Sequence, residues 1–111
     1  MSLPEDGIKM SSKRNKELFI RAISCFGKNH QLLLLIEECN ELCVEVSHLM
    51  REKGDLDRLS EEIADVFIML NEVIFMFDLG KRVEKCINQK LKRLENILGL
   101  KTCGGLCDNK E

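Results

Sequence analysis

The feature that most restricts the fold is a pair of long segments, residues 30–53 and 56–78, whose apolar side chains recur every three or four residues. This spacing puts the apolar side chains on one stripe of an α-helix, and a short link between two such helices favours antiparallel packing. Shorter segments of the same kind occupy residues 12–26 and 81–98. We therefore expect an all-α protein, an up-down antiparallel bundle of about four helices. Glycines stand where helices should end: Gly27, Gly54 and Gly80.

Length and composition agree with one helical domain. The chain has 111 residues, enough for a single modest core, and it carries five Phe but neither Trp nor Tyr. We expect the folded domain at residues 12–98, with flexible termini at 1–11 and 99–111. The start of the third helix is open, since Asp57 or Ser60 could cap it.

Two acid pairs lie inside the long segments, each with its members three residues apart, so that they share one helix face. They are Glu38 with Glu41 and Glu62 with Asp65. Each pair follows the apolar stripe one position behind it and so borders the core, where ionised groups are costly unless a counter-charge replaces water. Four converging carboxylates suit Mg²⁺, or Mn²⁺, better than zinc. The alternative is an exposed acidic flank that pairs with Lys and Arg.

The net charge of −2 hides a strong segregation along the chain. Residues 37–72 carry eleven acids and three bases, whereas residues 9–28 and 81–101 are each net +5. The acidic and basic segments either bind ions of opposite charge or attract one another within the bundle. Nucleic-acid binding is not expected, because the chain is slightly acidic and its basic residues are not interleaved with aromatic ones.

The segment 56–78 is apolar nearly all round its predicted helix, which indicates a second packing partner. Asn71 and Glu72 interrupt it well short of the roughly 20 residues that cross a bilayer, so we expect no membrane span. The predicted partner is another subunit, in a homodimer or tetramer. No signal-like stretch opens the chain, so most of its six cysteines are expected to be reduced and buried in the cytoplasm, while Cys103 and Cys107 lie in the tail.

The residues also resemble a known family. The run from Phe26 to Gln31, followed by Glu37-Glu38-x-x-Glu41 and then by Glu62-x-x-Asp65, is similar to the MazG-like branch of the all-α nucleotide pyrophosphohydrolases. The segment Asn88 to Arg93 resembles the family's Asn-x-Lys element, although Leu94 stands where a second Arg is often found. The resemblance covers about residues 20–98. It implies Mg²⁺-dependent hydrolysis of a nucleoside triphosphate to the monophosphate and pyrophosphate.

Residue roles follow from that chemistry. Attack on the α-phosphorus requires neutralised phosphate oxygens and an activated water, both of which bound Mg²⁺ supplies. We expect Glu38, Glu41, Glu62 and Asp65 to hold the metal. Glu41 is the first candidate for the general base, with Glu37 or Glu45 as alternatives.

Contacts to the substrate are expected at both ends of the domain. Asn88, Lys90 and Arg93 are expected to bind the triphosphate, with Lys81 and Lys85 further out. The alternative is that these long side chains extend to solvent. Gln31 lies seven residues before Glu38, on the same helix face, and could reach a base or sugar.

Two other functions remain open from the sequence. Glu45-x-x-His48 is half of the ligand set of a di-iron carboxylate bundle, but the second half is missing. A helical interaction or regulatory protein would need no metal at all. The sequence names neither the preferred base or sugar nor the biological purpose of the hydrolysis.

Overall fold

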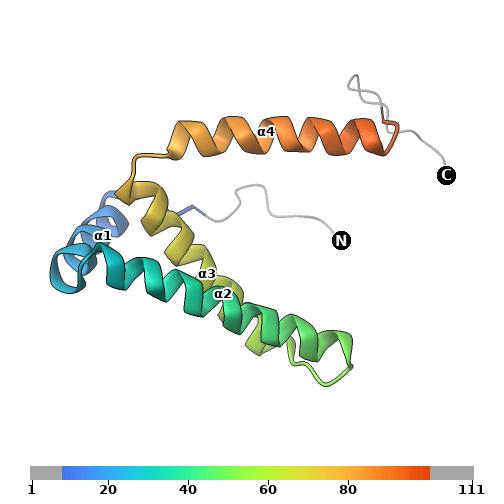
Figure 1. Ribbon diagram of the computed structural model, residues 1–111, viewed down its shortest axis with the longest axis horizontal. Coiled ribbons are helices and arrows are strands. Elements are labelled where there is room, and N and C mark those ends of the chain that lie inside the picture. The colour runs from blue at the N-terminus through green and yellow to red at the C-terminus, as the bar shows by residue number, and fades with distance from the viewer. Residues whose placement is uncertain (1–8, 101–111) are drawn as a thin grey trace. The chain divides into compact units, whose positions relative to one another are not determined.

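The computed structural model describes residues 9–100 and contains four α-helices in that range (Figure 1). Their bounds are α1 Lys13–Phe26, α2 Lys28–Met50, α3 Leu56–Met76 and α4 Gly80–Ile97. Because no strand occurs between residues 9 and 100, the predicted all-α class is confirmed. Residues 1–8 and 101–111 lie outside the described part, and the predictions for the two ends and for Cys103 and Cys107 fall largely there.

The first helix begins and ends as its sequence dictates. The Ser12 hydroxyl oxygen accepts a hydrogen bond of 3.1 Å from the backbone N–H of Asn15, which satisfies one of the free donors of the first turn. At the other end Gly27 has a φ of +90°, a conformation that L side chains rarely adopt. This glycine lets α2 start directly after α1, with one residue between them.

The cap of α3 differs from both sequence candidates. Asp55 is the capping residue, and its carboxylate accepts a 2.8 Å hydrogen bond from the backbone N–H of Asp57. Ser60 instead donates its hydroxyl to the carbonyl of Leu56, within the helix. The proposed caps Asp57 and Ser60 were therefore wrong, because both residues lie inside the helix, which starts at Leu56.

Two helices end without a glycine. Glu52 and Asp78 follow the ends of α2 and α3 with φ values of 59° and 54°, in the left-handed region. The N–H groups of Glu52 and Lys53 bond the carbonyls of Leu49 and His48, which closes the last turn of α2. Gly54 lies in the link that follows, as expected, but Gly80 begins α4 and does not end α3.

The helices α1, α2 and α3 form one compact unit, residues 9–78 of the described chain. The most extensive packing joins α2 to α3, which runs back alongside it after the short link (Figure 1). The buried apolar residues are Phe19, Val66 and Met69, and the Phe19 ring lies 6.1 Å from that of Phe75. This small core leaves many large apolar side chains exposed.

The inward face of α3 is rotated relative to the expected stripe. Ile63 and Leu70, which belong to the apolar residues recurring every three or four positions in segment 56–78, are 46% and 43% exposed. Met69 and Glu72 are buried in their place, at 8% and 2%. Packing of α1 against α3 through Phe19 centres the buried face there, and this brings the acidic stripe of α3 to the helix interface.

The fourth helix belongs to a second compact unit and is described by itself. It is strongly amphipathic, with apolar residues at Val83, Ile87, Leu91 and Leu94 and six basic residues among the others. Within residues 9–100, none of the helices has both the length and the apolar character that crossing a bilayer requires.

Candidate metal centre

Three carboxylates converge where α2 and α3 pack together. Glu38 comes from α2, and Glu62 and Asp65 come from successive turns of α3. One carboxylate oxygen of each lies within 4.8 Å of the others. The structure thus brings together three of the four residues expected to bind metal, from segments that are 24 residues or more apart in sequence.

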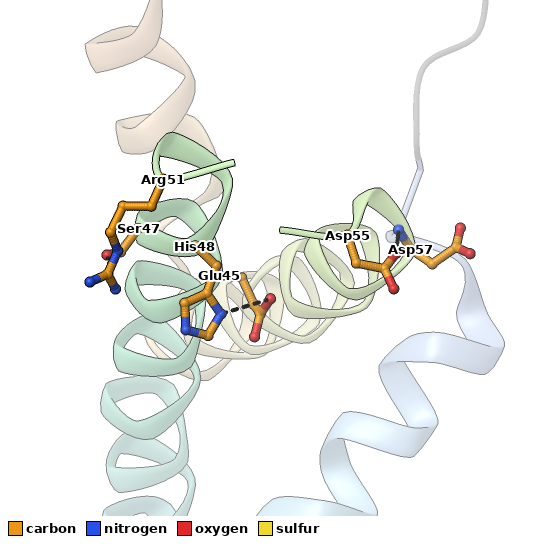
Figure 2. A network of polar contacts seen from close by, with 6 residues as sticks. All are labelled: Glu45, Ser47, His48, Arg51, Asp55 and Asp57. Carbon is orange, nitrogen blue, oxygen red and sulfur yellow. Dashed lines mark hydrogen bonds and ion pairs between the residues drawn. The ribbon is translucent and has the colours of Figure 1, made fainter. Parts of the chain in front are cut away.

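These carboxylates lack cationic partners. The one ion pair among residues 9–100 joins His48 Nδ1 to Glu45 Oε1 at 3.7 Å, both on α2 (Figure 2). Glu62 Oε1 is buried and accepts no hydrogen bond within the described chain. An acidic flank neutralised by Lys and Arg, the alternative for these residues, is therefore absent from the described residues.

The electrostatic consequence appears in two pKa values. Burial raises the pKa of the Glu38 carboxyl, and the charges of Asp65, Glu41 and Glu37 raise it further. The pKa of Glu62 is raised by the same two causes, burial first and then the neighbouring carboxylates, of which Glu41 contributes most. Both shifts mean that the group disfavours a negative charge unless a cation is added.

The donor set fits a hard divalent cation. Carboxylate oxygens are the ligands that Mg²⁺ and Mn²⁺ prefer, and opposite ligands of Mg²⁺ lie about 4.2 Å apart, given bonds of about 2.1 Å. Adjacent ligands lie about 3.0 Å apart, so the three oxygens, which are within 4.8 Å of one another, would have to move closer together to bind one ion. The buried, unpartnered oxygen of Glu62 points to the same conclusion, since a cation would satisfy it.

Two of the three candidate general bases, Glu41 and Glu37, lie beside this group. Glu41 and Glu37 are exposed on α2 and are not among the three residues that converge within 4.8 Å. The charge of Glu41 nevertheless acts on both Glu38 and Glu62, and that of Glu37 acts on Glu38. Both are thus close enough to contribute to chemistry at this centre.

The predicted substrate contacts occupy different places. Gln31 is 4% exposed, and its Nε2 donates a 2.8 Å hydrogen bond to Glu72 Oε1. On α4, Lys90 and Arg93 line one shallow groove with Cys86 and Gln89. Asn88 lines another groove of the same helix, which also contains the two outer residues expected to contribute, Lys81 and Lys85.

One buried acid was missed by the sequence reading. Glu72 was regarded only as an interruption of the apolar run, yet it is 98% buried on the inward face of α3. A signal was present, because Glu72 follows Asp65 by seven residues, just as Gln31 precedes Glu38 by seven. The two spacings place Gln31 two helical turns from Glu38 and Glu72 two turns from Asp65, both along the α2–α3 interface.

Histidine takes no part in the carboxylate group. His48 bonds within its own helix, to Glu45, while Arg51 donates to the Ser47 hydroxyl at 3.1 Å nearby (Figure 2). His30, the other histidine of the chain, contacts Gln31. The group of Glu38, Glu62 and Asp65 therefore does not have the ligand composition of a di-iron carboxylate centre.

The comparison with protein families decides the relationship. The sequence model of the MazG nucleotide pyrophosphohydrolase domain matches residues 26–96, which is more than half of the chain. The chain belongs to the MazG nucleotide pyrophosphohydrolase family. Comparisons with curated proteins and with solved structures gave no match.

The matched range contains every carboxylate of the candidate centre. It runs from the last residue of α1 through α2 and α3 to the last turn of α4. Members of the MazG family are hydrolases that act on nucleotides and generally use a divalent metal. The acidic group at the α2–α3 interface is where this chain has residues suited to hold one.

Proposed function

We propose that this MazG protein hydrolyses nucleoside triphosphates between the α and β phosphates, releasing a nucleoside monophosphate and pyrophosphate. The observation that carries the proposal is the convergence of Glu38, Glu62 and Asp65 without a cationic partner. Family membership supplies the reaction class, and the geometry supplies a place for it.

The proposed metal is Mg²⁺, with Mn²⁺ as a substitute. Glu38, Glu62 and Asp65 would hold it, and Glu41 would complete the set by a change of side-chain rotamer. When bound, the ion neutralises the oxygens of the triphosphate and lowers the pKa of the attacking water. The protein contributes the fixed positions of the carboxylates, which the packing of α2 on α3 sets before substrate arrives.

Glu41 is the proposed general base, and Glu37 is the alternative. Both are exposed beside the centre, so either carboxylate can accept a proton from a water placed at the edge of the group. Substitution by Gln separates their roles. The general base is the residue whose loss lowers kcat strongly even at saturating Mg²⁺.

Lys90, Arg93 and Asn88 are the proposed contacts to the triphosphate. Lys90 and Arg93 present two cations on one face of α4, and charge-assisted hydrogen bonds to phosphate are among the strongest that side chains make. The helix carries no acid between them. Gln31 is buried against Glu72, so any contact that it makes to the base is indirect.

Self-association is also proposed. Large apolar side chains of α2 and α3 are 40% or more exposed; examples are Ile36, Val44, Ile63, Ile68 and Leu70. So much exposed apolar surface is typical of chains that bury it against another copy. The expected cytoplasmic location stays a prediction.

The test is pyrophosphate release from a panel of NTPs and dNTPs, with and without Mg²⁺. We expect turnover that requires the metal and that Glu62→Gln reduces by at least a hundredfold. Glu61→Gln is the matched control, since Glu61 is the exposed neighbour on the same helix and is not part of the group. Folded protein without turnover on any nucleotide would exclude the proposed reaction, and a non-catalytic helical interaction protein would then remain.

A further inference from the structure

A second polar layer lies on the α2–α3 interface, two helical turns from the metal centre. It consists of Gln31 and Glu72, which are 4% and 2% exposed. The seven-residue spacings to Glu38 and to Asp65 correspond to about 10 Å along each helix. The buried amide of Gln31 and the buried carboxylate of Glu72 therefore lie at the same distance along the two helices from the carboxylates of the metal centre.

Glu72 is an unfavourable residue for a core position. Its Oε1 accepts the hydrogen bond from Gln31, but its Oε2 is buried and has no partner within residues 9–100. Such an oxygen loses its hydration without compensation. An apolar residue at this position would give a more stable protein, so the carboxylate indicates a functional constraint.

The hydrogen bonds of this layer reach the surface at His30. The Gln31 amide turns its NH₂ group toward Glu72 Oε1, and its own Oε1 then faces His30 Nδ1 at 2.9 Å. The Gln31 oxygen accepts, so the hydrogen of neutral His30 resides on Nδ1. Its Nε2 is left with a lone pair.

His30 is placed to meet a ligand. Its side chain is exposed, and its ring stacks on that of Phe26 with centroids 5.2 Å apart and an interplanar angle of 29°. His30, Glu37 and Glu41 are spaced by seven and four residues, and all three are exposed on one stripe of α2. About 10 Å of helix separates His30 from Glu37, an extent comparable to the reach of a nucleotide from α-phosphate to base.

We propose that His30 reads the base of the nucleotide, accepting through Nε2 a hydrogen bond from the base's exocyclic amino group beside the Phe26 ring, with Gln31 and Glu72 as positioning residues. This rests on the proposed hydrolysis of nucleoside triphosphates. Cytosine and adenine present an amino group where uracil and thymine present a carbonyl oxygen. That carbonyl would place two lone pairs against each other, so amino-bearing bases are preferred.

The test uses dCTP and dUTP, which differ at a single group of the base edge. We expect kcat/KM of the wild type to favour dCTP by about tenfold, the effect of one hydrogen bond to a site that needs it. His30→Ala should remove this preference by lowering kcat/KM for dCTP, because the hydrogen bond to its amino group is lost. Because His30 lies on the surface, the variant keeps the core intact.

The positioning role has its own readout in the metal-free protein. Ring ¹⁵N chemical shifts of His30, assigned by comparison with His48→Ala, should report hydrogen on Nδ1, since the chain has two histidines. Glu72→Leu should raise the melting temperature, move the hydrogen to Nε2 and reduce the dCTP preference. Glu72→Gln should preserve both properties, because its amide oxygen still accepts from Gln31.

The outcomes separate this inference from the reaction itself. An active His30→Ala enzyme with an unchanged dCTP to dUTP ratio overturns base reading and leaves the hydrolase intact. Hydrogen on Nε2 in the wild type overturns the positioning by Gln31 and Glu72. A wild type that hydrolyses no nucleotide overturns the hydrolase, and base reading with it.

Discussion

Removing one carboxylate from the metal centre should have opposite effects on stability with and without Mg²⁺. In the metal-free protein, Glu62 is repelled by Glu38, Asp65 and Glu41, and its Oε1 is buried without a partner. Glu62→Gln removes the charge, so the melting temperature of the metal-free protein should rise. The same substitution removes one of the proposed metal ligands, so stabilisation by Mg²⁺ should be lost.

The size of the metal effect follows from mass action. An ion present at 100 times its Kd stabilises the native state by about 2.7 kcal/mol. For a domain of this size that corresponds to an increase of about 10–20 °C in Tm. If Glu62→Gln weakens binding about a hundredfold, the same Mg²⁺ concentration equals the new Kd, and the increase falls to about 2–3 °C.

The assay is differential scanning calorimetry at the Mg²⁺ concentration fixed from a titration of the wild type. Glu61→Gln makes the same change of charge one residue away and should respond to Mg²⁺ like the wild type. Equal loss of the Mg²⁺ effect in both variants would refute the reasoning, because it would mean that Mg²⁺ acts by general screening. A full Mg²⁺ effect in Glu62→Gln would refute it as well.

Three further predictions concern pH, substrate binding and assembly. The pKa of Glu38 is higher in the folded protein, so the native state binds more protons than the unfolded state. This contribution to the stability of the metal-free protein is complete below the unfolded pKa and is lost as pH rises through the folded pKa. Calorimetry should find a smaller loss of stability with rising pH in Glu38→Gln. In steady-state kinetics Lys90→Ala should raise KM about tenfold or more with little change in kcat, because a phosphate contact is lost, whereas Lys92→Ala, in the other groove of α4, should change KM less. Light scattering should give a multiple of the 12.8 kDa chain mass, and Leu70→Lys should reduce it if α3 forms the interface; a monomeric wild type would contradict the proposed assembly.

The helices could be predicted from the sequence because apolar periodicity is a local signal. Segments 56–78 and 81–98 differ from α3 and α4 by two residues or fewer at each end. The ends of the helices were harder to predict. Glu52 and Asp78 adopt the left-handed conformation usually given to glycine, and the cap at Asp55 depends on one side-chain hydrogen bond that no pattern identifies.

The convergence of Glu38, Glu62 and Asp65 could be predicted for a similar reason. Acids three residues apart must share a helix face, so the expectation needed only the pairing of α2 with α3. The layer of Gln31 and Glu72 was not found, because a single polar residue in an apolar run resembles an interruption. Its meaning depends on the rotation of α3, which periodicity defines only to within a neighbouring stripe and which depends on packing against α1 and α2, where Phe19 meets Phe75.

The most direct measurement is the anomalous diffraction of a crystal grown with Mn²⁺. We expect one strong peak at the α2–α3 interface, bonded at about 2.1 Å to oxygens of Glu38, Glu62 and Asp65. Manganese bound only at other residues, with these three carboxylates close together and without an ion, would contradict a metal centre at this interface.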